Sequence, residues 1–168
     1  DKVRIQRELA RALAELVHCF REASLFIMWC ETCFKTFQRE WYRLDKYRID
    51  KYYTLIRFSF NSMFEYIMKL KWDKNIISQF VAVLKRDVIE QRKAIGFKFH
   101  IADLYVEELC KVGGETLGND EFLQLLHPFI YEFSNSTNEG WQRRLKSSIF
   151  DKIIDDFHFK EYFDTKKK

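Results

Sequence analysis

Apolar residues recur at the three- and four-residue spacing of an α-helix along almost the whole of this chain. Only one proline and five glycines occur in its 168 residues, so few positions can interrupt a helix. The stretch 24–41 is apolar on most sides of the expected helix, which indicates burial between several neighbours. The pattern therefore predicts an all-α fold whose helices pack in layers.

Seven helices joined by short links are expected. They cover about residues 3–20, 24–41, 45–70, 74–91, 98–112, 119–134 and 136–157. Ser136 and Glu139 have the spacing of a capping box at the start of the last one. Long helices with short links favour an irregular stack of antiparallel helix pairs, as in HEAT and armadillo proteins, and a closed helical bundle is the alternative. We expect residues 1–160 to form a single domain from a longer protein and residues 161–168 to begin a charged, lysine-rich extension.

The charge is nearly balanced overall but unevenly distributed along the chain. The formal net charge is +4, and the last three residues, all lysines, supply three of these charges. The remainder does not require a polyanionic partner. Residues 69–98 hold eight Lys or Arg against three acids, whereas residues 103–139 hold eight acids against one lysine. Such a dipolar chain can orient a partner, although solvated helix faces produce the same pattern.

Neither a membrane nor a metal is expected from the sequence. No apolar run reaches the roughly 18 residues that a membrane-spanning helix needs, and the chain does not start with a signal sequence. Cys30 and Cys33 are half of a zinc site at most, since structural zinc takes four ligands. On a helix the two thiols share one face, so we interpret them as core residues. Free cysteines favour a reducing compartment, nucleus or cytosol, and no cofactor is predicted.

The stretch 38–57 interleaves basic and aromatic residues, a pattern typical of RNA-binding surfaces. On a helical wheel, however, most of the aromatic side chains turn inward and the charges form two columns. Asp45 and Arg48 lie in one column, and Asp50 and Arg57 lie in the other. We interpret these four residues as a structural charge network that holds adjacent helices together, because a partly buried ion must be paired.

The basic residues that follow one another from Lys35 to Lys46 have two possible roles. Lys35, Arg39, Arg43 and Lys46 follow one another at helical spacing. They form either a row that faces phosphates or an ordinary solvated face. The same wheel places Phe58 on the outward side.

The stretch also carries a family resemblance. The matching residues are Arg39-Glu-Trp41, Asp45, Arg48-Ile-Asp-Lys-Tyr-Tyr53, Leu55 and Arg57, and further along Trp72, Phe99-His100, Asp103, Tyr105, Glu108, Leu109, Lys111-Val-Gly-Gly114, Pro128-Phe129 and Phe150. This set resembles the signature of the ribosomal RNA processing protein 1 family, also called nucleolar protein 52, and it covers essentially the whole chain. Arg43 stands where that family often has a small residue.

The resemblance implies a ribosome biogenesis factor of the nucleus and nucleolus that has no enzymatic activity. Members of the family act as scaffolds in precursor particles of the large ribosomal subunit and are needed for processing of its rRNA. The implied partners are pre-rRNA and other assembly factors, with no membrane, cofactor or small-molecule substrate. The family also has a helical segment before the region matched here and a lysine-rich region after it.

Two function hypotheses follow, a scaffold that binds pre-rRNA and an adapter that binds only proteins. For the scaffold, the candidate contacts to RNA phosphates are Lys85, Arg86, Arg92, Lys93, Lys98, Arg143, Arg144 and Lys146. The near-neutral charge and the acidic segment 103–139 favour the adapter. A hydrolase or transferase is a third possibility, but the four histidines are scattered and no nucleophile motif occurs, so no catalytic residue is predicted.

One expectation concerns the first helix. If another helical layer precedes it in a longer protein, its outer side should expose apolar residues. Ile5, Leu9, Leu13 and Leu16 are the candidates for this strip.

Overall fold

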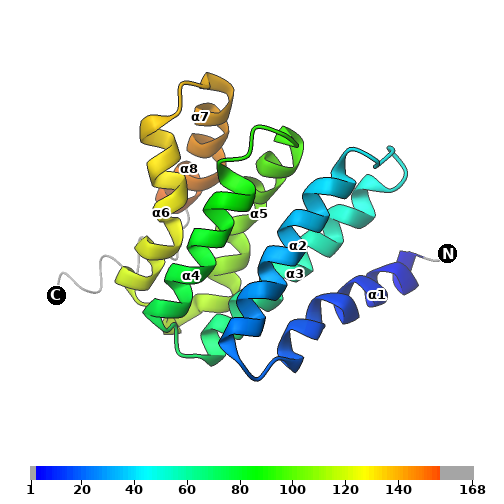
Figure 1. The fold of residues 1–168 in the computed structure, drawn as a ribbon. Coiled ribbons are helices and arrows are strands. Elements are labelled where there is room, and N and C mark those ends of the chain that lie inside the picture. Colours follow the sequence, from blue (N-terminus) through cyan, green and yellow to red (C-terminus); the bar gives the residue numbers. More distant parts are fainter. Residues whose placement is uncertain (1–2, 156–168) are drawn as a thin grey trace.

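The computed structural model describes residues 3–155, and all regular structure in this range is helical (Figure 1). The expected end of the last helix at 157 and the charged extension 161–168 lie outside the described residues. None of the described helices is sufficiently long and apolar to cross a lipid bilayer.

The described residues form seven helical rods. They are α1 (Val3–Glu15) with a 3-10 turn η1 (Leu16–Cys19), α2 (Ala23–Trp41), α3 (Ile49–Lys69), α4 (Lys74–Leu84) with a π-helical turn η2 (Lys85–Ile89), α5 (Ile95–Gly113) with a 3-10 turn η3 (Gly114–Thr116), α6 (Asn119–Asn135), and a last rod made of α7 (Glu139–Leu145), the π-helical turn η4 (Lys146–Phe150) and α8 (Asp151–Asp155). The prediction of an all-α fold with about seven helices is therefore confirmed.

The rods are arranged in two layers (Figure 1). In one layer, α3 packs between α1 and α5, and α5 packs against the last rod. In the other layer, α4 packs between α2 and α6. Successive rods alternate between the layers, so each helix mainly contacts its neighbours in the stack. The arrangement is the predicted irregular stack of antiparallel helix pairs.

Aromatic rings fill the space between the two layers. Tyr105 on α5 is fully buried and its ring contacts Phe64 on α3 at 5.2 Å and Phe129 on α6 at 4.7 Å, measured between ring centroids. Phe80 on α4 and Phe26 on α2 continue this contact chain at 6.4 Å. Tilted and edge-on contacts of this kind add to the free energy of burial. The wide apolar face predicted for residues 24–41 therefore packs against aromatic residues of the neighbouring helices.

The cysteines are free, and Cys30 and Cys33 pack into or against this core. Burial raises the pKa of the Cys33 thiol to about 12, and burial also raises the pKa of Cys30. A thiol whose pKa is raised this far stays protonated and uncharged, so it packs as a small apolar group. In the range 3–155, no cluster of three or more His, Cys, Asp and Glu side chains is placed to hold a metal ion.

Three helix starts differ from the sequence prediction by three or more residues, and one of them is that of α5, which begins at Ile95 instead of residue 98. The third helix begins at Ile49 instead of Asp45, because the Asp45 carboxylate accepts hydrogen bonds from the backbone N–H groups of Tyr47 and Arg48 and stabilises a turn. The predicted capping box at Ser136 is wrong. Asn138 caps the last rod, since its Oδ1 accepts the N–H of Trp141 at 2.9 Å.

The surface of α1 has two distinct sides. The small residues Ala10 and Ala14 are buried, and α1 packs against α3. On the exposed surface, the predicted apolar strip is present: Ile5, Leu9, Leu13 and Leu16 are between 42% and 60% exposed. Phe58 of α3, which was expected to point outward, is instead half-buried under the guanidinium groups of Arg7 and Arg11, at 5.8 and 5.0 Å from its ring centroid.

Candidate nucleic-acid interface

The end of the stack where α2 finishes carries the loops 42–48 and 90–94, which lie at the top of Figure 1. The hydroxyl of Tyr42 accepts a hydrogen bond from the backbone N–H of Ala94 and thereby ties one loop to the other. Gly96, in the first turn of α5, lies against the Trp41 ring, where an added Cβ would approach the indole nitrogen to 2.9 Å. Two contacts therefore tie the loop regions to each other: the hydrogen bond from Ala94 to Tyr42 and the packing of Gly96 against Trp41.

The aromatic residues of the stretch 38–57 divide into two groups. Trp41 and Tyr53 turn inward and pack against His100 of α5, with ring centroids 6.1 and 4.1 Å from the imidazole. Tyr42 and Tyr47 remain on the surface, with 65% and 74% of each residue exposed. The inward group and the exposed Tyr47 both agree with the helical-wheel prediction, although Tyr47 lies in a loop instead of the predicted first turn of the helix.

His100 of α5 is a largely buried ionisable group that packs against Trp41 and Tyr53. Its Nε2 atom is buried without a hydrogen-bond partner among the described residues. Burial lowers the pKa of His100 to about 4, outweighing a hydrogen bond with the Tyr53 backbone. The imidazole is therefore neutral in the folded protein throughout the physiological range.

This burial makes the stability of the chain sensitive to acid. His100 takes up a proton in the unfolded chain near pH 6.5 but in the folded chain only near pH 4, so acidification favours unfolding. We expect the free energy of unfolding to fall by about 2 kcal/mol between neutral pH and about pH 5, at 1.36 kcal/mol per pKa unit. Urea titrations at several pH values measure this loss. The variant His100→Asn cannot titrate there, and an unchanged acid sensitivity in it would contradict the assignment.

The four residues predicted to form one charge network lie in three separate places. Asp45 and Arg48 form an exposed pair within the loop, with 2.8 Å between the Arg48 Nη2 and the Asp45 carboxylate. This hydrogen bond from Arg48 lowers the pKa of Asp45. Asp50 is exposed in the first turn of α3, where its charge complements the helix dipole. Only Arg57 joins two helices.

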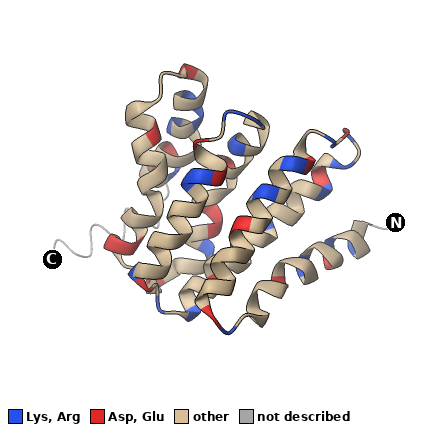
Figure 2. Cartoon of the chain, viewed as in Figure 1, with Lys and Arg blue, Asp and Glu red and all other residues tan. Residues whose placement is uncertain are grey.

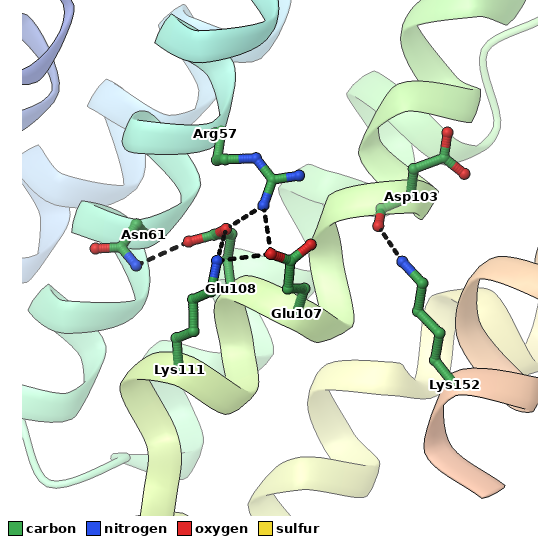
Figure 3. A network of polar contacts seen from close by, with 7 residues as sticks. All are labelled: Arg57, Asn61, Asp103, Glu107, Glu108, Lys111 and Lys152. Atoms are coloured by element: carbon green, nitrogen blue, oxygen red, sulfur yellow. Dashed lines mark hydrogen bonds and ion pairs between the residues drawn. The ribbon is translucent and has the colours of Figure 1, made fainter. Parts of the chain in front are cut away.

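Arg57 of α3 contacts two adjacent glutamates of α5 (Figure 3). Its Nη1 lies 2.8 Å from Glu107 and 2.6 Å from Glu108. The Glu108 side chain is only 4% exposed and also accepts hydrogen bonds from Asn61 and Lys111. A buried carboxylate with three donors is fully satisfied, and the network connects two neighbouring helices of one layer.

A second set of contacts joins α5 to the last rod. The Asp103 carboxylate accepts hydrogen bonds from Arg144 at 3.1 Å and from Ser148 at 2.5 Å. The Asp103 carbonyl accepts one from Lys152 at 2.6 Å (Figure 3). Helical spacing did not identify Glu108 or Asp103 as links between helices, because the partners on the neighbouring helices, Arg57 and Asn61 for Glu108 and Arg144 and Ser148 for Asp103, lie more than 40 residues away in the sequence. Both are among the residues that carry the family resemblance, and this was the one signal that could have found them.

Most of the predicted RNA-contacting cations are engaged by acids of this chain. Lys85 lies 3.5 Å from Glu90, Arg86 lies 2.6 Å from Asp87 and 2.9 Å from Glu31, Lys98 lies 3.6 Å from Glu132, Arg144 lies 3.1 Å from Asp103, and Lys146 lies 2.9 Å from Asp151. Lys98 is also largely buried, with its ammonium 4.3 Å from the Trp141 ring centroid, and this burial lowers its pKa.

Three of the predicted contacts differ from the rest. Arg92, Lys93 and Arg143 are exposed, and none of them forms an ion pair with another residue of the described range 3–155. Figure 2 shows blue segments on the loops after α2 and before α5, and Arg92 and Lys93 belong to the second of these loops, residues 90–94. The hydrogen bond between Ala94 and Tyr42 therefore ties the loop that holds Arg92 and Lys93 to the loop 42–48.

Comparison with known proteins identifies the family. The family model described as nucleolar protein Nop52 matches residues 1–168. The chain belongs to the Nop52 family. This membership confirms the resemblance inferred from the residues around Trp41 to Arg57.

Curated proteins give the same result for this Nop52 family member. The human ribosomal RNA processing protein 1 homolog B is 32% identical over 161 residues, which cover 95% of this chain and 21% of that protein. The mouse homolog B is 30% identical over 157 residues, covering 92% and 22% of the two chains. The Dictyostelium discoideum homolog is 28% identical over 174 residues, covering 92% and 35%. The chain thus spans about a fifth to a third of the length of these relatives.

Proposed function

We propose that this chain is the helical scaffold domain of a nucleolar ribosome biogenesis factor. In this proposal it acts in precursor particles of the large ribosomal subunit, promotes processing of the pre-rRNA, and binds both rRNA and other assembly factors without catalysing a reaction. The observation that carries the proposal is the Nop52 family match over residues 1–168, together with relatives named for ribosomal RNA processing.

The architecture is suited to such a role. A two-layer stack has a long surface relative to its volume, and it offers helix faces and rows of loops to several partners at once. Its ionic clusters, Arg57 with Glu108 and Asp103 with Arg144, are used between helices of the stack. These contacts hold the helices in fixed positions, so that the surfaces of the stack can bind partners. Such a role does not involve turnover of a substrate.

A second candidate is an adapter that binds only proteins. The exposed apolar strip on α1 favours it, because apolar surface of this kind is typical of protein contacts. The ion pairs made by Lys85, Arg86 and Lys146 also favour it, since a paired cation contributes less to phosphate binding.

The test uses the full-length protein in cells from which the endogenous copy can be depleted. Wild-type protein is expected to accumulate in the nucleolus, to sediment with precursors of the large subunit, and to restore processing of the large-subunit rRNA. A version lacking residues 1–168 is expected to lose the sedimentation and the processing. Normal processing with the deleted version would overturn the proposal. Crosslinking of the wild-type protein to RNA separates the scaffold from the adapter.

A further inference from the structure

We infer that the loops 42–48 and 90–94, together with the first turn of α3, form a binding surface for single-stranded RNA, with Lys46, Lys51, Arg92 and Lys93 as the phosphate contacts and Tyr47 as a platform for a base. We call residues 39–51 and 90–93 the loop-end surface. This inference rests on the proposed function and names the part of the domain that contacts RNA.

The charge of the loop-end surface is the first argument. It holds seven basic and four acidic residues, and all seven basic side chains are exposed. Three of the four acids have basic partners: Glu40 pairs with Arg39 and Arg43, Asp45 pairs with Arg48, and Glu90 lies near Lys85. The fourth, Asp50, is exposed in the first turn of α3. The four proposed contacts, in contrast, have no acidic partner among residues 3–155, so their charges are available to a polyanion.

The second argument is that the surface is preformed. Residues 46 and 92 are far apart in the sequence, but the hydrogen bond from the Ala94 N–H to the Tyr42 hydroxyl holds their loops together. Ala94 itself has a left-handed backbone, with φ of 52°, which turns the chain from the basic loop into α5. Fixed cations lose less conformational freedom on binding than cations on independent loops.

The third argument concerns the form of the RNA. Tyr47 is 74% exposed, and the Lys46 ammonium lies 5.0 Å from its ring centroid. An exposed tyrosine ring beside a basic side chain is suited to stack on an unpaired base while the cation contacts the neighbouring phosphate. Bases in a duplex are already stacked on each other and do not offer a free face. The surface therefore matches single-stranded RNA better than a duplex.

Charge reversal on each loop tests the phosphate contacts. The probes are a fluorescein-labelled single strand of ribosomal RNA and a duplex of the same composition, titrated with the 168-residue chain at several salt concentrations. We expect Arg92→Glu/Lys93→Glu and Lys46→Glu/Lys51→Glu each to weaken binding by about tenfold and to lower the salt dependence, by about 0.7 in log–log slope for each lost contact.

The matched control reverses the same number of charges at the opposite end of the stack. Arg21 precedes α2 and Lys71 follows α3, and both are exposed. Arg21→Glu/Lys71→Glu therefore changes the net charge equally but leaves the loop-end surface intact, and we expect it to change affinity less than about threefold. An equal loss in the control and in the loop variants would overturn the inference.

Substitution of Tyr47 tests the stacking platform. Tyr47→Ala is expected to weaken binding of the single strand at least about fivefold, whereas Tyr47→Phe keeps the ring and the affinity. Wild-type chain that binds no RNA would overturn the inference and favour an acidic protein partner. RNA binding that persists in all loop variants would overturn the assignment of RNA binding to the loop-end surface. It would leave the proposed function standing, since the cellular test of residues 1–168 does not depend on these variants.

Discussion

Replacing Tyr105 with alanine is expected to lower the free energy of unfolding by about 4 kcal/mol, within the range seen for large-to-small changes of buried aromatic residues. The side chain is fully buried between α3 and α6, where it contacts the rings of Phe64 and Phe129. Its hydroxyl also donates a hydrogen bond to the Leu125 carbonyl at 2.9 Å. The substitution therefore opens a cavity where the two layers meet and removes a polar contact.

Urea unfolding followed by circular dichroism measures this effect. The control Tyr105→Phe keeps the ring and removes only the hydroxyl, so we expect a loss of about 1 kcal/mol. A Tyr105→Ala variant that is no less stable than Tyr105→Phe would contradict the position of this ring in the core.

The second large effect is expected from Arg57→Ala, at about 3 kcal/mol. Removing the guanidinium leaves Glu108 buried with only Asn61 and Lys111 as donors, and a buried carboxylate that loses its main cation is strongly destabilising. The measurement is again the free energy of unfolding. Arg57→Lys retains a charge and is expected to lose less.

A double variant separates the ion pair from the loss of packing. Arg57→Met/Glu108→Met replaces both charges by apolar side chains of similar length, and we expect it to recover most of the stability lost in Arg57→Ala. A double variant as unstable as Arg57→Ala would show that the buried charge of Glu108 is not the cause of the loss.

The helices of this fold were predictable because their pattern is local. Apolar spacing identified the seven rods and their order, and Cys30 was placed in the core for the same reason. The helix starts were less predictable. Asp45 and Asn138 each hold backbone N–H groups with a side chain, and this competition with helix formation does not alter the apolar period.

The candidate interface was predictable only in part. Sequence analysis selected cations by their clustering, and Arg92 and Lys93 are exposed in a loop that the Ala94–Tyr42 hydrogen bond ties to the loop 42–48. It could not distinguish them from Lys98 or Arg144, because the acids that pair with these two, Glu132 and Asp103, lie more than 30 residues away in the sequence. Pairing across a helical stack depends on tertiary register, and a single sequence does not reveal that register.

Because of the way α1 packs, this helix is expected to unfold less cooperatively with the rest of the domain than α3 or α5. This helix is held mainly by α3, through two alanines and the Arg7 and Arg11 contacts with Phe58, whereas α3 has neighbours on both sides. In a stack of this kind stability is close to a sum over adjacent units, so a helix that has one neighbour in its layer among residues 3–155 can open alone. The amide hydrogens of α1 should therefore exchange with solvent through a local opening that leaves α3 and α5 closed, and a partner seated on α1 would suppress that opening.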